Sequence, residues 1–515
     1  MDIAKGLTSS LKRPQINIKK EHIFLVIILA AASFLLLFNL GNQYLWQDEA
    51  QTALISKTVL TRGLPFGYDG KNFFSQIRGA EYGRNYIWRW QGWFPFYLLA
   101  AFFKLFGINT FTARLPFALF GIATILLMYY FSKSLFQNKR AAMTATALLA
   151  LSTPFLILAK QCRYYSPAIF FSLLGLYSYL NVLQQKRYSS LIFVGALTLL
   201  FHSNYTSFGI LLFSILVHYS LFYIRQLKIL WLCLSAIAIN LPWIVWFSGM
   251  KYDVTHRGSI FHLNIGPFKD SIWYYITRIE KHMFPAYLVL IALAVAIFNF
   301  KRIKNSFLEN IQVWKNLALL IIFCIANILM LALVTDYAFF RYIGVLIPAV
   351  CTIVAGILVS LMKINFTAGI ALVVLLVFSH SFADYIYEIS HDYDGPIEGI
   401  VKYLNQYGTK DDTVAITYGD LPLKFYTDMR VVGGLTGEDC SLAAWAKWVI
   451  LRKHSICPMD MATRECLIKT VPWDAFEMVT LDYPDTPFEN REDPDQHYYR
   501  TVRNEDRVVI YRRIK

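Results

Sequence analysis

Charged side chains are scarce in this sequence: Asp, Glu, Lys and Arg make up 16% of its 515 residues, whereas 56% are hydrophobic. With a mean hydropathy of +0.43, the chain is typical of membrane proteins rather than of soluble enzymes. Cysteine is also rare, and its seven positions show no zinc-site spacing. Three cysteines lie in the polar C-terminal region, Cys440, Cys457 and Cys466, so one disulfide is possible there and one thiol is left over.

Carboxylates are the scarcest charges of all before residue 384. Residues 1–383 contain 11 Asp and Glu against 33 Lys and Arg, and residues 384–515 contain 23 against 16. The positive excess therefore belongs to the apolar part of the chain, where basic cytoplasmic loops set the orientation, and no patch is left for nucleic acid. None of the 11 carboxylates falls in the middle of an apolar run, as those of proton-coupled transporters usually do.

Eleven apolar runs have roughly the 17 to 25 residues that a membrane-spanning helix needs. The first follows Lys19 and Lys20 and lacks a cleavage site, so we expect a retained helix with its N-terminus in the cytoplasm. If the chain changes sides at each expected span, every loop assigned to the cytoplasm is basic, as the positive-inside rule requires. The same alternation places residues 42–112, 249–283 and the tail after 383 outside. The expected spans are 22–41, 113–132, 141–158, 166–184, 190–206, 208–223, 229–248, 284–300, 316–335, 343–362 and 366–383.

One further apolar segment, residues 93–107, would reverse this orientation if it crossed the membrane. The segment is short, opens at Pro95 and is interrupted by Lys104. We therefore predict an interfacial or re-entrant helix within the outer loop 42–112.

The tail differs in composition and predicts a small α/β domain over residues 384–515. The segment IEGIVKYLNQYG has helical spacing, and 413–419, 445–452 and 507–514 have the character of strands. The polar stretch YPDTPFENREDPDQ at 483–496 is typical of a loop. The expected fold is a polytopic α-helical membrane domain over 1–383, followed by this extracytoplasmic domain.

Two of the few carboxylates stand side by side in LWQDEA, directly after the first expected span. A carboxylate at the boundary of a low-dielectric region can have its proton affinity raised toward the range of a general base, which makes Asp48 a candidate for that role. The alternative is structural: an Asp at the N-cap of a helix over AQTALISKTVL, with Glu49 favourable near the positive helix end. The two interpretations are compatible, because a cap also fixes the carboxylate in place.

Arginines with neighbouring tyrosines mark two more outer turns. The stretch LAKQCRYYSP places Arg163 beside Tyr164, and TDYAFFRYIGVLIP places Arg341 beside Tyr342. Cations on the outer side run against the orientation rule, which favours a specific contact with an anionic phosphate. Snorkelling of the two arginines to lipid headgroups is the alternative.

The first outer loop adds aromatic rings and charges in GAEYGRNYIWRWQGWFPF. Aromatic rings stack on sugar faces and arginine pairs with phosphate. Glu81, Tyr82, Arg89 and Trp90 are therefore candidates for contacts with a sugar, an acceptor or a lipid headgroup. An interfacial aromatic belt has the same composition and stays an alternative.

A second outer loop, KYDVTHRGSIFHLN, contributes His256 and Arg257 as candidate acceptor or sugar contacts. Its histidines raise the question of a metal site, but no HxH or HxxxH spacing occurs. Solvated loop residues are therefore the simpler interpretation.

The order of these motifs resembles the dolichyl-phosphate-mannose-protein mannosyltransferase-like superfamily. Its bacterial members, including the aminoarabinose transferase that modifies lipid A, are GT-C fold glycosyltransferases. The resemblance covers most of residues 20–430 and is strongest over 40–185. It rests on the Asp-Glu pair, LFGINTFTARLPFALFG, ALLALSTPFLILAKQCRYYSP, RYIGVLIPAV and the tail opening IEGIVKYLNQYGTKDDTVAIT.

The resemblance implies an inverting enzyme of the inner (plasma) membrane. Such an enzyme takes a sugar from a polyprenyl-phosphate carrier on the outer face and transfers it to a hydroxyl of a protein, lipid A or a glycan. It places Asp48 at the catalytic centre, with Glu49 assisting. It makes Arg163 and Arg341 contacts to the donor phosphate, in the company of the tyrosine that follows each.

The sequence departs from the family at one motif. Many members carry His-Pro-Pro or Lys-Pro-Pro where this chain has GWFPF, so Arg89 is the substitute candidate for that phosphate contact. No cofactor is required when arginines supply the positive charge. Some relatives use a divalent metal, and here Asp48 and Glu49 would hold it.

Two other functions stay open. A flippase for lipid-linked sugars would also need arginines that contact phosphate, but it has no use for a carboxylate at the transfer point. An O-antigen ligase or polymerase would be expected to carry a large basic outer loop with a catalytic His, and the acidic tail argues against it.

Overall fold

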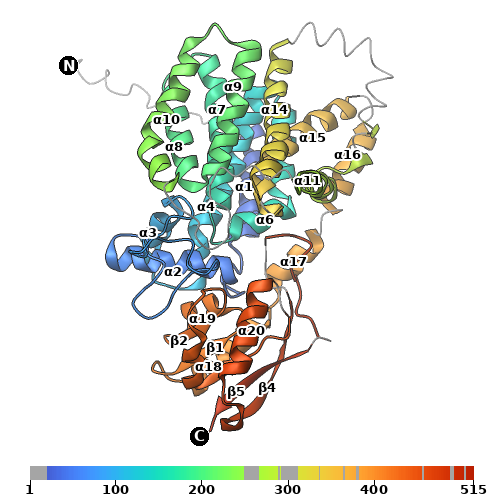
Figure 1. Cartoon of the computed structure of the whole chain (residues 1–515). Coiled ribbons are helices and arrows are strands. Elements are labelled where there is room, and N and C mark those ends of the chain that lie inside the picture. The colour runs from blue at the N-terminus through green and yellow to red at the C-terminus, as the bar shows by residue number, and fades with distance from the viewer. Residues whose placement is uncertain are drawn as a thin grey trace, which may run out of the picture.

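The computed structural model describes residues 20–248, 266–287, 290–291, 311–335, 337–363, 366–378, 382–454, 457–487, 492–503 and 506–514. These residues form a bundle of helices and, beyond one end of it, a smaller part built around a sheet (Figure 1). Helices α2 (Gln47–Arg62) and α3 (Phe94–Phe106) lie between the two (Figure 1). We call this the sheet-facing end of the bundle.

Six helices of the described chain are long and apolar enough to cross a membrane, and the bent pair α5–α6 makes a seventh span if it is counted as one. The chain is therefore a multi-pass membrane protein, as its composition predicts. The six are α4 (Thr110–Phe136), α7 (Tyr165–Leu183), α9 (Tyr205–Phe222), α10 (Leu227–Ser248), α14 (Ile311–Val334) and the pair η1 (Phe340–Leu346) and α15 (Ile347–Met362).

The bend between α5 (Lys139–Ala150) and α6 (Thr153–Lys160) measures 62°. Pro154 lies in the first turn of α6, where its missing N–H cannot continue the hydrogen bonds of the preceding helix. The bend brings the C-terminal end of α6, and with it the turn that carries Arg163, to the sheet-facing end.

The prediction of eleven spans is confirmed only in part. The runs at 22–41 and 190–206 form the shorter apolar helices α1 (Lys20–Leu37) and α8 (Ser189–Ser203). The run at 366–383 divides between α16 (Phe366–Phe378) and α17 (Phe382–Ser390), and the span expected at 284–300 lies largely outside the described residues.

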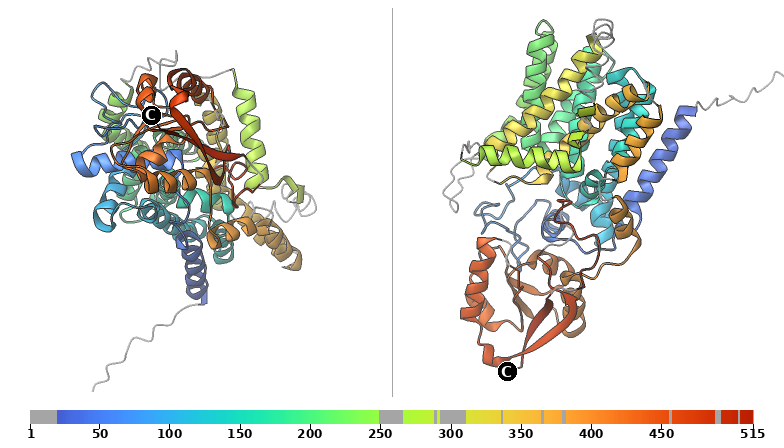
Figure 2. Two further views of the ribbon diagram at one scale, coloured as in Figure 1. Left: turned by 90° about the horizontal axis from the view of Figure 1, so that it is seen from below. Right: turned by 90° about the vertical axis from the view of Figure 1, so that its right-hand side faces the viewer.

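The segment 93–107 forms α3, which has 13 residues. A helix of this length is about 20 Å long, too short for the roughly 30 Å of a bilayer core. The segment 249–283, predicted as an outer loop, contains a helix that the sequence pattern did not predict, α11 (Phe268–His282), which lies across the end of the bundle (Figure 2).

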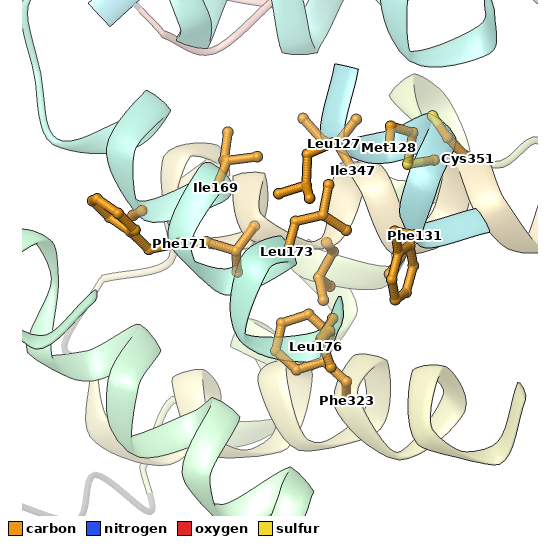
Figure 3. Packing of buried hydrophobic residues seen from close by; sticks show 14 of the residues in the cluster. Leu127, Met128, Phe131, Ile169, Phe171, Leu173, Leu176, Phe323, Ile347 and Cys351 are labelled. Carbon is orange, nitrogen blue, oxygen red and sulfur yellow. The ribbon is translucent and has the colours of Figure 1, made fainter. Parts of the chain in front are cut away.

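The core of the bundle is a continuous cluster of aliphatic and aromatic side chains from α4, α7, α14 and α15 (Figure 3). Leu127 and Phe131 of α4 lie near Leu173 and Leu176 of α7 in this view. The helices also approach closely at Gly121 of α4, where a Cβ atom would lie 2.8 Å from the Cβ of Ala159. Burial of this kind fixes α4 against α6, and both helices lead to the site described below.

The C-terminal part contains a five-stranded sheet of order β2-β1-β3-β5-β4. The first three strands are parallel, and β5 runs antiparallel to both β3 and β4. Strands β2 and β4 were not predicted from the sequence. The elements are α18 (Pro396–Tyr407), β1 (Thr413–Ile416), α19 (Asp420–Tyr426), β2 (Arg430–Gly433), η2 (Cys440–Trp445), β3 (Trp448–Ile450), α20 (Pro458–Thr470), η3 (Trp473–Ala475), β4 (Phe476–Pro484) and β5 (Arg507–Arg513).

Residues of the segment 42–112 join the two parts through buried hydrogen bonds. The amide of Gln47, at the start of α2, donates to Asp420 at 2.8 Å and accepts from the backbone of Leu421. Lys424 donates to the Phe73 carbonyl at 2.8 Å. These contacts place α19 directly against α2.

Cys440 and Cys466 form a disulfide that joins η2 to α20, and Cys457 keeps a free thiol. We expect a maleimide reagent to label five thiols in the denatured protein before reduction and all seven after it. Mass spectrometry counts the added groups. Labelling of seven thiols without reduction would contradict this pairing.

Glu388 of α17 ties the tail to the bundle. Its carboxylate accepts a hydrogen bond from Lys160 of α6 and lies 2.7 Å from Nε2 of His497. Burial alone would raise the pKa of Glu388, but Lys160 and His497 outweigh burial and lower the pKa to about 2. The ionised form therefore stabilises the fold above the ordinary glutamate pKa of 4.5, and this contribution is lost as the pH falls toward 2.

We expect Glu388→Gln to lower the free energy of unfolding by about 3 kcal/mol at pH 7, because Lys160 stays buried beside a neutral partner. The difference from the parent protein shrinks as the pH falls from 4.5 toward 2. Unfolding in detergent, followed by tryptophan fluorescence, measures both. Asp482→Asn, on a residue whose side chain is 94% exposed, is the control, and a difference that does not change with pH would refute this account.

Candidate active site

Asp48 and Glu49 lie in the first turn of α2. Trp46, and not Asp48, occupies the N-cap position. Glu49 makes the capping contact instead, because its Oε2 accepts the backbone N–H of Trp46 at 3.4 Å. The carboxylate of Asp48 is therefore directed to partners outside the helix.

Glu49 forms a buried ion pair with Arg114 of α4. Arg114 Nε donates to Oε1 at 2.8 Å and Nη2 donates to Oε2 at 2.6 Å. The same Oε1 accepts the backbone N–H of Cys162 at 2.8 Å, so the pair also fixes the turn after α6. The remaining Arg114 donors bind the carbonyls of Leu40, Gln43 and Tyr44 at 3.1, 2.9 and 3.2 Å.

Asp48 lies between two arginines that come from distant parts of the chain. Its Oδ2 is 3.3 Å from Nη2 of Arg163 and 3.4 Å from Nη1 of Arg341. Its Oδ1 accepts a hydrogen bond from the Gln76 amide at 3.0 Å. The structure therefore brings together the three residues on which the sequence analysis relied most.

These two contacts are longer than the 2.7–2.9 Å of a tight charge-assisted hydrogen bond. Arg163 is held in addition by the Asp48 carbonyl and the Thr52 hydroxyl, both at 3.1 Å. Its Nε is buried and has no hydrogen-bond partner among the described residues. A buried charged donor in this state is costly, and a substrate anion would satisfy it.

Aromatic rings surround the two guanidinium groups. Arg163 lies 5.5 Å from the ring centroid of Tyr164 and 6.0 Å from that of Tyr165. Arg341 lies 5.5 Å from the ring of Tyr342. The rings limit the access of water to the cations, which strengthens their interaction with an anion.

Glu492, like Arg114 and Gln76, is a residue of this site that was not predicted from the sequence. It belongs to the polar stretch 483–496, which was predicted only as a loop, and its Oε1 lies 2.8 Å from Nη1 of Arg341. Its side chain is 5% exposed. No local pattern distinguishes it from the other acids of that stretch.

Glu81 is buried and is linked to Asp48 through Gln76. Its carboxylate accepts hydrogen bonds from the Ser75 hydroxyl and, at 2.6 Å, from the backbone N–H of Gln76. Burial raises the pKa of Glu81, and these hydrogen bonds only partly oppose the rise. Since the Gln76 amide also donates to Asp48, Gln76 links the two carboxyl groups.

The other candidates of the first loop face different neighbours. Tyr82 packs in a group of aromatic rings, 6.4 Å from the ring of Trp88. The guanidinium of Arg89 lies 4.6 Å from the ring of Trp246 in α10. The carbonyl of Trp90 accepts a hydrogen bond from the Tyr205 hydroxyl at 3.3 Å. His256 and Arg257 lie outside the described residues.

The GWFPF motif has a structural explanation at Gly92. A Cβ atom there would lie 2.1 Å from the backbone oxygen of His202 at the end of α8. Only glycine allows the loop to approach α8 this closely.

The Asp48–Glu49 pair does not fit a metal ion. Both oxygens of Glu49 already bind Arg114, so only Asp48 has a carboxylate directed toward the site. Among the described residues, His282, Asp493 and Asp495 form another group with ligand atoms within 4.8 Å of one another. Asp495, however, already pairs with Arg278 and with Lys281, the latter at 2.6 Å.

The family model for dolichyl-phosphate-mannose-protein mannosyltransferase matches residues 91–246. The structure resembles ArnT from Cupriavidus metallidurans bound to undecaprenyl phosphate, with a TM-score of 0.53, 14% identity and coverage of 95% of this chain and 98% of ArnT. The chain has the GT-C fold. The resemblance inferred from the sequence motifs is thereby confirmed.

Other solved structures support the same GT-C fold. ArnT without a ligand gives a TM-score of 0.55 at 13% identity, covering 96% of this chain and 98% of ArnT. The oligosaccharyltransferase AglB from Archaeoglobus fulgidus, in complex with an inhibitory peptide and a dolichol-phosphate, gives 0.53 at 12% identity, covering 90% and 74%. A comparison with curated protein sequences found no match.

We expect Glu49→Gln and Arg114→Gln each to lower the free energy of unfolding by about 3–5 kcal/mol, because each leaves an uncompensated charge in the GT-C bundle. The double variant should lose less than the sum of the two, since neither charge is then left alone. Thermal unfolding in detergent of all four proteins gives the coupling energy. Additive losses would mean that the two side chains do not act as a pair.

Proposed function

We propose that this GT-C protein is an inverting glycosyltransferase that moves a sugar from a polyprenyl-phosphate donor to an acceptor hydroxyl at the outer face of the membrane. The observation that carries the proposal is the position of Asp48 between Arg163 and Arg341. A carboxylate can accept the proton of the attacking hydroxyl, and two guanidinium groups can bind the phosphate that leaves. The ArnT and AglB structures hold undecaprenyl phosphate and a dolichol-phosphate, which supports this donor class.

The reaction would proceed in one displacement. The acceptor oxygen attacks the anomeric carbon on the side opposite the phosphate, so the configuration inverts, and its proton passes to Asp48. The bond between the anomeric carbon and the phosphate oxygen breaks, and its electron pair stays on that oxygen. A positioned base contributes about 10²–10⁴-fold to such a step, and one donor for the developing charge contributes about 10²–10³-fold.

The roles of the nearby residues follow from their contacts. Arg163 offers a buried Nε without a partner among the described residues, and we assign to it the first contact with the phosphate. Glu49 holds α2 and the Arg163 turn in place and takes no part in proton transfer. Arginines thus supply the positive charge, and we propose that no metal is required at Asp48 and Glu49.

The residues that contact the sugar and the acceptor are assigned from their positions around Asp48. Glu81 and Tyr82 remain candidate contacts on the side of the first loop, because Gln76 connects Glu81 to Asp48. Arg89 and Trp90 contact the ends of α10 and α9 and are better placed for the carrier lipid.

The orientation in the membrane is part of the same proposal. We place the N-terminus in the cytoplasm, the spans within residues 1–383 and the domain 384–515 outside the inner membrane. The disulfide between Cys440 and Cys466 supports this, because such bonds persist in oxidising compartments. The acceptor would be a protein, a lipid or a glycan on that side.

We expect Asp48→Asn to lower the rate of sugar transfer by at least about 100-fold, because the amide cannot accept the proton. Binding of polyprenyl phosphate should persist in this variant. Transfer of a labelled sugar from a polyprenyl-phosphate donor to membrane acceptors measures the first quantity, and equilibrium binding in detergent measures the second.

Asp270→Asn is the matched control, because Asp270 is an exposed acid in the first turn of α11. Transfer at the parental rate by the Asp48→Asn protein would contradict the proposal. If that protein also moved the lipid-linked sugar across vesicle membranes, a flippase would be the better assignment.

A further inference from the structure

A short acidic segment of the tail lies on cations and polar groups of the bundle. We call residues 492–497 the acidic segment. Its side chains contact three separate elements at the sheet-facing end, namely η1, α11 and α17. The contacts are Glu492 with Arg341 at 2.8 Å, Asp493 with the Tyr274 hydroxyl at 3.1 Å, Asp495 with Lys281 at 2.6 Å and with Arg278, and His497 with Glu388 at 2.7 Å.

The contact between Glu492 and Arg341 differs from a structural ion pair of the same site. Glu49 and Arg114 meet through two parallel hydrogen bonds, and both Glu49 oxygens have further backbone donors. Glu492 meets Arg341 through one oxygen, and its other oxygen is buried without a hydrogen-bond partner among the described residues. A half-satisfied buried carboxylate adds little stability, so a purely structural role does not account for it.

The charges of the site bear directly on phosphate binding. Arg163 and Arg341 carry two positive charges, and Asp48 and Glu492 carry two negative charges within contact distance of them. The same Nη1 of Arg341 lies 3.4 Å from Asp48 and 2.8 Å from Glu492. A phosphate that binds Nη1 of Arg341 therefore competes with the carboxylate of Glu492 for that donor.

We propose that Glu492 competes with the carrier phosphate for Arg341 and thereby promotes release of the polyprenyl-phosphate product. This inference rests on the proposed transferase function. The donor is a phosphodiester with one negative charge. Cleavage of the sugar–oxygen bond leaves a phosphate monoester, whose second pKa is near 6, so the product carries close to two charges at neutral pH.

This change in charge explains why a competing carboxylate is useful. The product binds two arginines more strongly than the donor does, and without a competitor it would stay in the site. When Glu492 returns to Arg341, it replaces one of the two cation contacts of the phosphate. The acidic segment is attached to α11 and α17 by its other contacts, which keep the carboxylate close to Arg341.

The test is equilibrium binding of undecaprenyl phosphate to the full-length protein in detergent. We expect Glu492→Gln to bind this lipid about tenfold more tightly than the parent protein, because a charge-assisted competitor is removed. Glu492→Asp keeps the charge and should bind nearly as the parent does. Steady-state transfer by Glu492→Gln should show a lower donor KM, a lower kcat and stronger inhibition by added polyprenyl phosphate.

Asp482→Asn makes the same change in net charge on an exposed residue and is expected to bind like the parent. Arg341→Gln should weaken binding, and this variant tests the phosphate contact of Arg341 separately from the competition by Glu492. If Arg341→Gln binds as the parent does, the proposed phosphate contact fails and the inference fails with it. If Arg341→Gln weakens binding but a folded Glu492→Gln protein binds no more tightly than the parent, only the competition by Glu492 is wrong.

Discussion

The buried ion pair between Glu49 and Arg114 determines the positions of Asp48 and of the turn that carries Arg163. Its carboxylate is adjacent in sequence to Asp48, and it accepts the backbone N–H of Cys162, which is adjacent to Arg163. One carboxylate therefore holds the proposed base and a proposed phosphate ligand at a fixed distance. Because the pair is enclosed by apolar helices, removing either partner leaves a bare charge in a low-dielectric environment. The site thus depends on the folding of α2 against α4.

The site contains two kinds of charge. Glu49 and Arg114 satisfy each other completely and act as structure. Asp48, Arg163, Arg341 and Glu492 meet through single or longer contacts, with polar atoms left over on Arg163 and Glu492 among the described residues. Incomplete pairing of this kind leaves donors for a substrate, at a cost in stability that the surrounding fold must offset. The bent pair α5–α6 and the packed core provide that support.

The sheet-containing part contributes directly to the site. Its helix α19 is bound to α2 through Gln47 and Asp420, and its acidic segment reaches Arg341. Both connections involve polar groups buried between parts that are far apart in sequence. The tail is therefore a participant in the proposed reaction, and contacts with α11 and α17 hold the segment 492–497 in position.

The sequence alone determined the membrane-spanning character of the chain and the positions of its candidate site residues. Long apolar runs predict the spans, and the arginines and carboxylates at their ends predicted Asp48, Arg163 and Arg341, because charges at membrane boundaries stand out from their neighbours. Tertiary structure alone decided the partners: Arg114 lies 65 residues from Glu49, and Glu492 lies 151 residues from Arg341. Strands β2 and β4 and helix α11 likewise depended on packing. An ion pair leaves no periodic pattern along the chain, so only the fold shows which charges meet.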